Sequence, residues 1–136
     1  MAQPVARTAE AARVGASRPK VAVLFTRPET VLEDIARVMR LGEAERHLPK
    51  GVPVLLKLNI SWQYWYPACS TPPWQLEGVI RALKGMGYED LIPAQNGTVV
   101  VDSLVGEVNN GHKAVLERYG LKSIHLDVAP TRWVPY

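Results

Sequence analysis

The segment between residues 59 and 73 carries the side chains best suited to chemistry. Ser70 and Thr71 stand directly before Pro72-Pro73, and a proline pair of this kind favours the first turn of a helix. A helix start offers unpaired backbone N–H groups and the positive end of the helix dipole, and both attract anions. The pattern predicts a phosphate or carboxylate site here, with an ordinary helix cap as the alternative.

Four further polar residues, at the ends of two expected strands, are expected near this helix start. Lys57 and Asn59 lie at the carboxyl end of an expected strand, where ligands bind in open parallel sheets. Gln95 and Asn96 follow another expected strand and can join the same crevice. We therefore predict a site for a small anionic or phosphorylated ligand, and its ligand-binding residues are Lys57, Asn59, Ser70, Thr71, Gln95 and Asn96.

Cys69 is the one cysteine of the chain and its one catalytic candidate. Proximity to a helix N-terminus can make a thiol nucleophilic, although most lone cysteines are inert apolar groups. A single cysteine cannot form an internal disulfide or hold an iron–sulfur cluster by itself. His47, His112 and His125 lack the spacing of a metal site. We therefore expect no metal centre, and the sequence names no cofactor.

The same segment is rich in aromatic residues, which is unusual for a loop. Trp62, Tyr64 and Trp65 could form the wall of the predicted pocket, because such rings offer a large contact area with a polar handle. They could equally form a surface for a protein partner, or the loop could fold back over its own core. The apolar end of the chain, residues 133–136, is a second candidate surface for a partner or for self-association.

Composition limits the class of protein. The chain has 136 residues, of which 47% are hydrophobic, and its net charge is +3. These values exclude general disorder, and no apolar run approaches the roughly 20 residues that cross a membrane. Residues 1–18 carry +2 of the charge and the rest only +1, so the body gives no case for nucleic-acid binding.

The chain divides into a flexible Ala/Arg-rich tail, residues 1–18, and one domain, residues 19–136. The tail lacks the apolar stretch of an export signal, so we expect a cytoplasmic protein. In the domain, apolar β-type runs alternate with helical patterns, which is typical of βαβ units. We predict an α/β fold of Rossmann-like, three-layer type, with helices on the faces of a mainly parallel sheet of about four to five strands. The strands are expected at residues 20–26, 52–58, 90–94 and 123–128.

Three local signals refine this prediction. A capping box beginning at Thr26 starts the first helix, and Gly42 ends it. Asn96-Gly97 between apolar runs favours a β-hairpin, and the alternative is one strand that leads into a functional loop. Asn109 or Asn110 could cap a third helix.

Several short motifs, taken in order, resemble domain-of-unknown-function family 362. The motifs are Lys57-Leu58-Asn59, the helix start from Ser70 to Glu77, residues 93–98, Tyr119-Gly120-Leu121 and His125-Leu126. The resemblance implies a Rossmann-like architecture and no settled activity. Members of the family are longer, so it also implies that this chain is the N-terminal part of a longer fold. Some relatives carry ferredoxin-type cluster segments, which have no counterpart here.

Three functions follow as hypotheses. The first is a domain that binds a small anionic ligand at the carboxyl ends of the strands. The second is half of a redox or transferase enzyme, which a missing C-terminal segment or a partner would complete. The third is an interaction module that uses the Trp/Tyr-rich loop.

Overall fold

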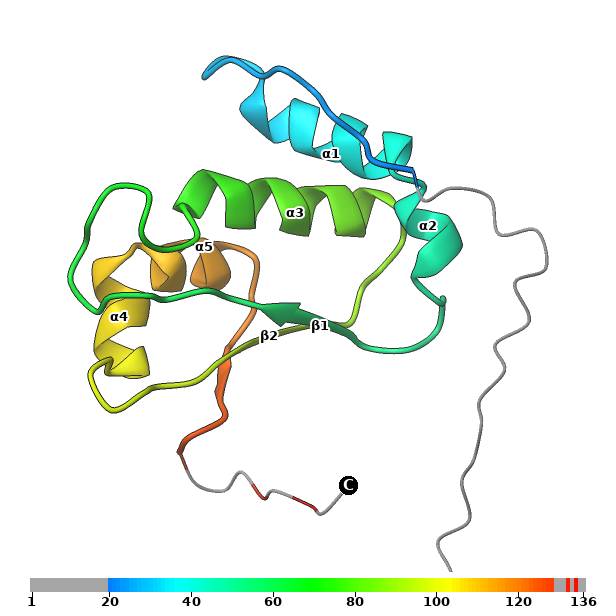
Figure 1. Ribbon diagram of the computed structural model, residues 1–136. Helices are drawn as coiled ribbons and strands as arrows, with labels where there is room; N and C mark the ends of the chain where they lie inside the picture. Colours follow the sequence, from blue (N-terminus) through cyan, green and yellow to red (C-terminus); the bar gives the residue numbers. More distant parts are fainter. Residues whose placement is uncertain (1–19, 129–131, 133, 135–136) are drawn as a thin grey trace, which may run out of the picture.

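The computed structural model describes residues 20–128, 132 and 134. The described chain is a mixed α/β fold in which helices alternate with the strands of a small parallel sheet (Figure 1). Its elements in chain order are α1 (Val31–Leu41), α2 (Ala44–His47), β1 (Val54–Lys57), α3 (Pro73–Gly85), β2 (Leu91–Gln95), α4 (Ser103–Asn109), α5 (His112–Arg118) and β3 (Ile124–His125).

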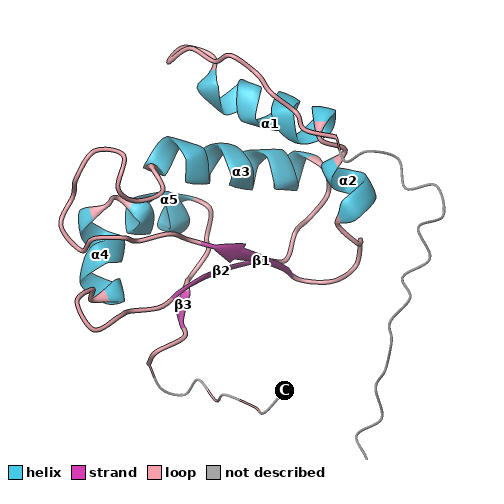
Figure 2. Ribbon diagram, viewed as in Figure 1, coloured by secondary structure: helices cyan, strands magenta, loops and turns pink. Residues whose placement is uncertain are grey.

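The sheet has the strand order β1-β2-β3, and both pairings are parallel. Leu55 pairs with Ile92, and Ala94 pairs with Ile124. Because the strands follow one another in a single direction and such crossovers are right-handed, their helices fall on one side of the sheet. Figure 2 shows α3 and α5 on that side. The opposite side is open, and Leu55 there is 61% exposed.

The hydrophobic core lies between the sheet and these helices. Ile80 and Leu83 from α3 are buried with Leu116 from α5 and with Leu58, directly after β1. The stripe at positions 76, 80 and 83 has helical spacing, so one face of α3 is apolar and packs inward. The prediction that Pro72-Pro73 opens this helix is confirmed, since Pro73 is its first residue.

The first helix forms an outer layer on α3 and does not cover the open side of the sheet (Figure 1). The two helices approach closely at Gly78, where an added Cβ would lie 2.3 Å from Cδ1 of Ile35. Gly42 caps the C-terminal end of α1, as predicted. The start differs, because α1 begins at Val31 and the Thr26 hydroxyl donates to Asp34 instead of capping the helix.

The predicted strand at residues 20–26 is wrong. This segment is extended but has no sheet partner, and it runs along the outer helix α1 (Figure 1). Val21, Val23 and Phe25 are exposed. The apolar alternation was a genuine strand signal, but α1 packs on α3 and carries the segment away from the sheet. A sheet of four to five strands is therefore not confirmed, since three strands occur in the described residues.

The region after β2 also differs from the sequence prediction. The strand ends at Gln95, and a lone antiparallel bridge joins Thr98 to Val101, so the Asn96-Gly97 hairpin does not form. The alternative, a strand that leads into a loop, is closer. A helix that was not predicted, α4, follows with Asp102 as its cap. Neither Asn109 nor Asn110 caps α5, which begins after Gly111 at a φ of 75°.

Two segments named in the sequence analysis lie wholly or mostly outside the described residues. The predicted tail lies outside the described residues, as does most of the apolar C-terminal end. In the part that is described, no helix is both long enough and apolar enough to cross a membrane.

Candidate functional site

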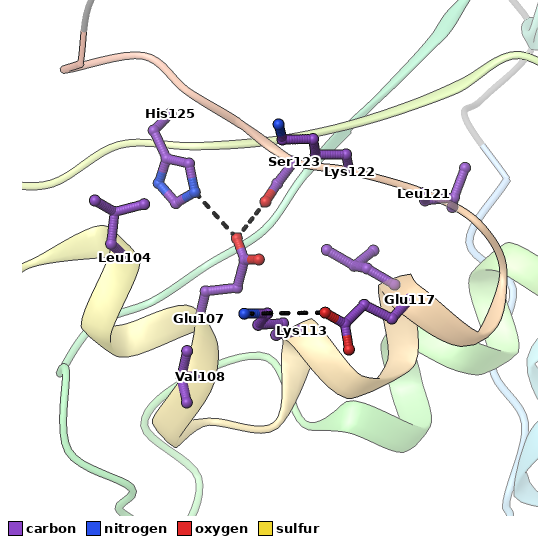
Figure 3. Close-up of a pocket in the computed structure, with 10 residues that line it drawn as sticks. Leu104, Glu107, Val108, Lys113, Glu117, Leu121, Lys122, Ser123 and His125 are labelled. Carbon is purple, nitrogen blue, oxygen red and sulfur yellow. Dashed lines mark hydrogen bonds and ion pairs between the residues drawn. The ribbon is translucent and has the colours of Figure 1, made fainter.

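A pocket of about 500 Å³ opens between α4, α5 and the chain that enters β3 (Figure 3). Its volume lies in the range of small-molecule sites, and it lies beside β3, along the chain that enters this strand. Its apolar lining is Leu104, Val108, Leu116 and Leu121, and its polar lining is Glu107, Lys113, Glu117, Lys122, Ser123 and His125.

Glu107 is the best-held polar group of this pocket. Its Oε2 atom accepts hydrogen bonds from the Gln95 amide and the Ser123 hydroxyl, and it lies 3.2 Å from Nε2 of His125. These three partners come from the end of β2, the chain before β3 and β3 itself, while Glu107 comes from α4. In Figure 3 the carboxylate points from its helix toward Ser123 and His125. Its second oxygen, Oε1, has no hydrogen-bond partner among the described residues.

The network continues through His125 to two further residues. Nδ1 of His125 lies 2.8 Å from the Ser103 hydroxyl, which is also 3.4 Å from Oδ1 of Asp127. A serine hydroxyl has one hydrogen, so Ser103 donates either to the imidazole or to the carboxylate. The pKa of Asp127 is lowered because the Gly97 N–H donates to its carboxylate at 2.7 Å, which outweighs the opposing effect of burial.

A chain of serine, histidine and carboxylate resembles the relay of many hydrolases, but its geometry here does not serve a nucleophile. Ser103 is 2% exposed and does not line the pocket, so an outside substrate cannot reach its hydroxyl. Both ring nitrogens of His125 already have partners. This network of side-chain contacts therefore fixes the position of Glu107. The second oxygen of the Glu107 carboxylate is left facing the pocket.

Local sequence explains why these residues meet. The Asp102 carboxylate accepts the Val105 N–H at 3.0 Å and so fixes the start of α4, one turn before Glu107. Gly106 allows α4 to approach the loop between β1 and α3, because an added Cβ would lie 2.6 Å from Cγ2 of Ile60. Strand alternation sends His125 to the side of the sheet that carries the helices and Ile124 to the open side.

Two lysines and two glutamates line the pocket, and they differ in how firmly each side chain is held. Lys113 lies 3.9 Å from Glu117 one turn along α5, and exposed pairs of this kind are weak. Lys122 has no ion-pair partner among the described residues. The Glu107 carboxylate, in contrast, is held by Gln95, Ser123 and His125. The pocket therefore offers two available ammonium groups and one fixed carboxylate oxygen.

Three of the predicted site residues do come together, at the base of the loop between β1 and α3. The Thr71 N–H donates to the Asn59 carbonyl at 2.9 Å, and the Thr71 hydroxyl accepts the Asn59 N–H at 3.2 Å. The Ser70 hydroxyl accepts the Ser61 N–H at 3.3 Å. These hydrogen bonds close the loop, which is a structural role that the sequence analysis did not consider.

The other predicted ligand-binding residues have different partners. Lys57 donates to its neighbouring Leu58 carbonyl at 2.5 Å and, like Leu55, belongs to the open side of the sheet. Asn96 donates to the Gly97 carbonyl. Gln95 is buried and bonded to Glu107. None of the three lines the cavity beside Ser70 and Thr71.

That second cavity, of about 300 Å³, lies at the start of α3. Its lining includes Ser70, Thr71 and Trp65, together with Tyr66 and Trp74. The predicted aromatic wall is therefore represented there by Trp65, whereas Trp62 and Tyr64 pack edge to face with each other at 6.0 Å. No lysine or arginine lines this cavity. Cys69 is partly buried in the same loop, and its proposed reactivity stays a prediction.

Sequence reasoning missed most of the pocket beside β3. Glu107 belongs to α4, a short helix that was not predicted, and Lys122 lies in the connection between α5 and β3, where no periodic pattern is expected. One usable signal was present, because Asp102-Ser103 is a helix-cap pattern that places Glu107 one turn later. His125 contacts both Ser103 and Glu107, and its side chain is mostly buried.

No protein-family model, curated protein or solved structure matches this chain. The resemblance to family 362 accordingly stays a prediction. Among the described residues, no group of three or more His, Cys, Asp or Glu side chains is placed to hold a metal ion.

Proposed function

We propose that this protein binds a small ligand with an anionic group, such as a phosphorylated or carboxylated metabolite, in the pocket between α4, α5 and β3. The observation that carries the proposal is that Lys122 and Glu107 line the same cavity of about 500 Å³. Lys122 has no ion-pair partner among the described residues, and the Glu107 carboxylate is held in place by hydrogen bonds. The ligand class is the one expected from the sequence, and the proposed position is different.

Each part of the ligand has a counterpart in the lining. The anionic group would contact the ammonium groups of Lys122 and Lys113, because charge-assisted hydrogen bonds are the strong ones. A hydroxyl or amino group of the ligand would donate to Oε1 of Glu107. The hydrocarbon part would lie on Leu104, Leu116 and the other apolar side chains. Since Glu117 would repel a bare anion, a ligand that also carries a donor fits better than inorganic phosphate.

The test is a thermal-shift and calorimetric screen of the full chain against small phosphorylated and carboxylated metabolites, with inorganic phosphate as reference. Lys122→Ala should weaken the detected binding roughly tenfold, since a hydrogen bond to a charged group contributes about 1.5–3 kcal/mol. Lys57→Ala is the matched control, because it removes an exposed lysine of the originally predicted site. Loss of binding in Lys57→Ala alone would move the site to the open side of the sheet, and an entirely negative screen would contradict the proposal.

A second candidate function is protein interaction through the loop between β1 and α3. The supporting observation is that four aromatic residues close together in this loop are exposed: Trp62, Tyr64, Trp65 and Tyr66. Trp65 and Tyr66 also line the cavity of about 300 Å³. Aromatic side chains are the usual anchors of interfaces. Binding of a fluorescent apolar dye should fall in Trp65→Ser with Tyr66→Ser. An unchanged dye signal would argue against this surface.

We also propose that the chain is part of a longer Rossmann-like fold of four to five strands, as the resemblance to family 362 implies. The open side of the sheet supports this, because Leu55 and Ile124 are apolar, exposed and without a covering layer in the described residues. Sequencing the gene past the Tyr136 codon tests it. An in-frame continuation would support the proposal, and a stop codon would contradict it.

A further inference from the structure

The lysines and glutamates that line the pocket beside β3 cancel in formal charge. Lys113 and Lys122 stand against Glu107 and Glu117. A phosphate monoester carries a charge of about −1.5 to −2 near neutral pH, so it would bring an excess of negative charge into this lining. A ligand that carries one positive and one negative group would match the lining without any excess.

The Glu107 carboxylate requires a hydrogen-bond donor from the ligand. Its side chain is 13% exposed, and its Oε2 atom is already in contact with Gln95, Ser123 and His125. In Figure 3 the second oxygen, Oε1, points away from His125. A ligand that fills the pocket removes water from this oxygen, and a buried carboxylate oxygen without a donor is unfavourable. An ammonium group is the best donor here, because its hydrogen bond to a carboxylate is charge-assisted.

The two lysines are available for the negative end of the ligand. Lys122 is exposed and has no ion-pair partner among the described residues. Lys113 lies 3.9 Å from Glu117, and an exposed pair at this distance is weak enough to exchange for a ligand carboxylate. Glu117 is exposed, so water can satisfy it without help from the ligand.

The wall that α4 contributes to the pocket is apolar and exposed. Leu104 and Val108 stand one turn apart on this helix, and they are 54% and 56% exposed. Covering such side chains with hydrocarbon is favourable, since it removes apolar surface from water. The pocket therefore offers an apolar surface next to its charged groups.

We propose that the ligand of this pocket is a free amino acid with an apolar side chain. Its ammonium group would donate to Oε1 of Glu107, its carboxylate would contact Lys122 and Lys113, and its side chain would cover Leu104 and Val108. This assignment rests on the proposed function and narrows its ligand class to molecules with both an amino and a carboxylate group.

The test is isothermal titration calorimetry of the full chain with leucine and three of its analogues. N-acetyl-leucine and 4-methylpentanoate lack the ammonium group, and leucinamide lacks the carboxylate. Each analogue should bind at least roughly tenfold more weakly than leucine, because each loses one charge-assisted hydrogen bond. These comparisons use the unaltered protein, so no folding defect can affect them.

Two variants assign the groups within the pocket. Glu107→Gln should weaken the binding of leucine and leave that of 4-methylpentanoate unchanged, with circular dichroism to show that the variant is folded. Leu104→Ala should weaken the binding of leucine more than that of alanine. Leu55→Ala is the matched control, because Leu55 is also an exposed leucine but lies on the open side of the sheet, and it should bind leucine as the wild type does.

The outcomes separate this assignment from the proposed function. Equal affinities for leucine, N-acetyl-leucine and 4-methylpentanoate would overturn the assignment, and they would leave an anion site in place. Tighter binding of a phosphorylated metabolite than of any apolar amino acid would also overturn the assignment alone. A chain that binds neither amino acids nor any anion of the metabolite screen would overturn both.

Discussion

At the scale of single residues, Glu107 explains why the pocket beside β3 has a defined shape. Two hydrogen-bond donors, Gln95 and Ser123, and the His125 ring meet at one of its oxygens, so the side chain joins α4 to β2 and β3. The other oxygen faces the pocket. A carboxylate held in this way links the helix to the sheet, and in the proposed function its second oxygen would accept a hydrogen bond from the ligand.

Glu107→Gln should lower the free energy of unfolding by about 1–3 kcal/mol, because hydrogen bonds to a charged acceptor are lost and buried donors lose their partner. Urea unfolding followed by circular dichroism measures this. Glu117→Gln is the control, since Glu117 lines the same pocket but is exposed and weakly paired, and it should change stability by less than about 0.5 kcal/mol. Equal effects of the two variants would show that the Glu107 network contributes nothing to stability.

Asp34 makes stability depend on acidity. Its pKa is lowered mainly by the hydrogen bond from Thr30, with further donors from Thr26 and Arg37, against the opposing effect of burial. Because the folded-state pKa lies below the unfolded value, protonation favours the unfolded chain. The stabilising contribution is complete above the ordinary carboxyl pKa of 3.8 and is lost as the pH falls through the lower folded-state value.

Asp34→Asn should therefore flatten the decline in unfolding free energy between neutral and strongly acidic pH, as measured by urea titrations across that range. Asp90→Asn is a suitable control, because this aspartate is exposed and its side chain has no hydrogen bond among the described residues. An identical acid dependence in wild type and Asp34→Asn would show that this carboxylate is not linked to folding.

The sequence placed six polar residues at one site, and the structure brings together three of them, in a role that was not predicted. Asn59, Ser70 and Thr71 do meet, because the loop must close before α3 can start, and that closure uses their polar groups. Lys57 does not join them, since strand alternation turns it toward the open side of the sheet. The position of Glu107 depended on a short helix that single-sequence patterns did not show.

At the scale of elements, helices with long apolar stripes were predictable and short or displaced elements were not. The outer helix α1 and the central helix α3 follow the expected spacing, with Gly42 and Pro73 at the expected ends. Residues 20–26 have the pattern of a buried strand, but tertiary packing places them outside the sheet. Local pattern specifies an extended conformation and leaves the choice of partner open.

The packing of α1 on α3 depends on Gly78. Ala is favoured over Gly in a helix by about 1 kcal/mol, but here its Cβ would lie 3.0 Å from Cβ of Ile35, which cannot move freely. We expect Gly78→Ala to destabilise the protein by about 1–2 kcal/mol through overpacking, as measured by urea unfolding.

Gly85→Ala is the control within the same helix, because nothing lies within 4 Å of its added Cβ, and it should be neutral or slightly stabilising. In an Ile35→Ala background, Gly78→Ala should become neutral or stabilising, since the obstructing side chain is gone. If Gly78→Ala remains equally destabilising in that background, then close helix contact is not the reason for this glycine.

At the scale of the whole molecule, the order of the strands accounts for the open side of the sheet. A one-directional order with right-handed crossovers collects α3, α4 and α5 on one side, so α1 packs on α3 as an outer layer (Figure 1). The α/β class followed from the alternation of strand and helix patterns. The number of layers did not, because it depends on where residues 20–26 go.

The same arrangement gives the molecule two separate surfaces. Charged and polar side chains gather in the pocket between α4, α5 and the chain that enters β3, and the exposed Phe25 and the cavity lined by Trp74 belong to the outer layer. The central claim is that the first of these is the ligand site.

Amide chemical-shift mapping during titration with the best metabolite from the screen tests this claim most directly. The account predicts saturable shifts in residues 104–108, 113–117 and 121–125, with a titration midpoint roughly tenfold higher in Lys122→Ala, and none in residues 59–73. Shifts confined to residues 59–73, or equal titration midpoints in wild type and Lys122→Ala, would contradict it.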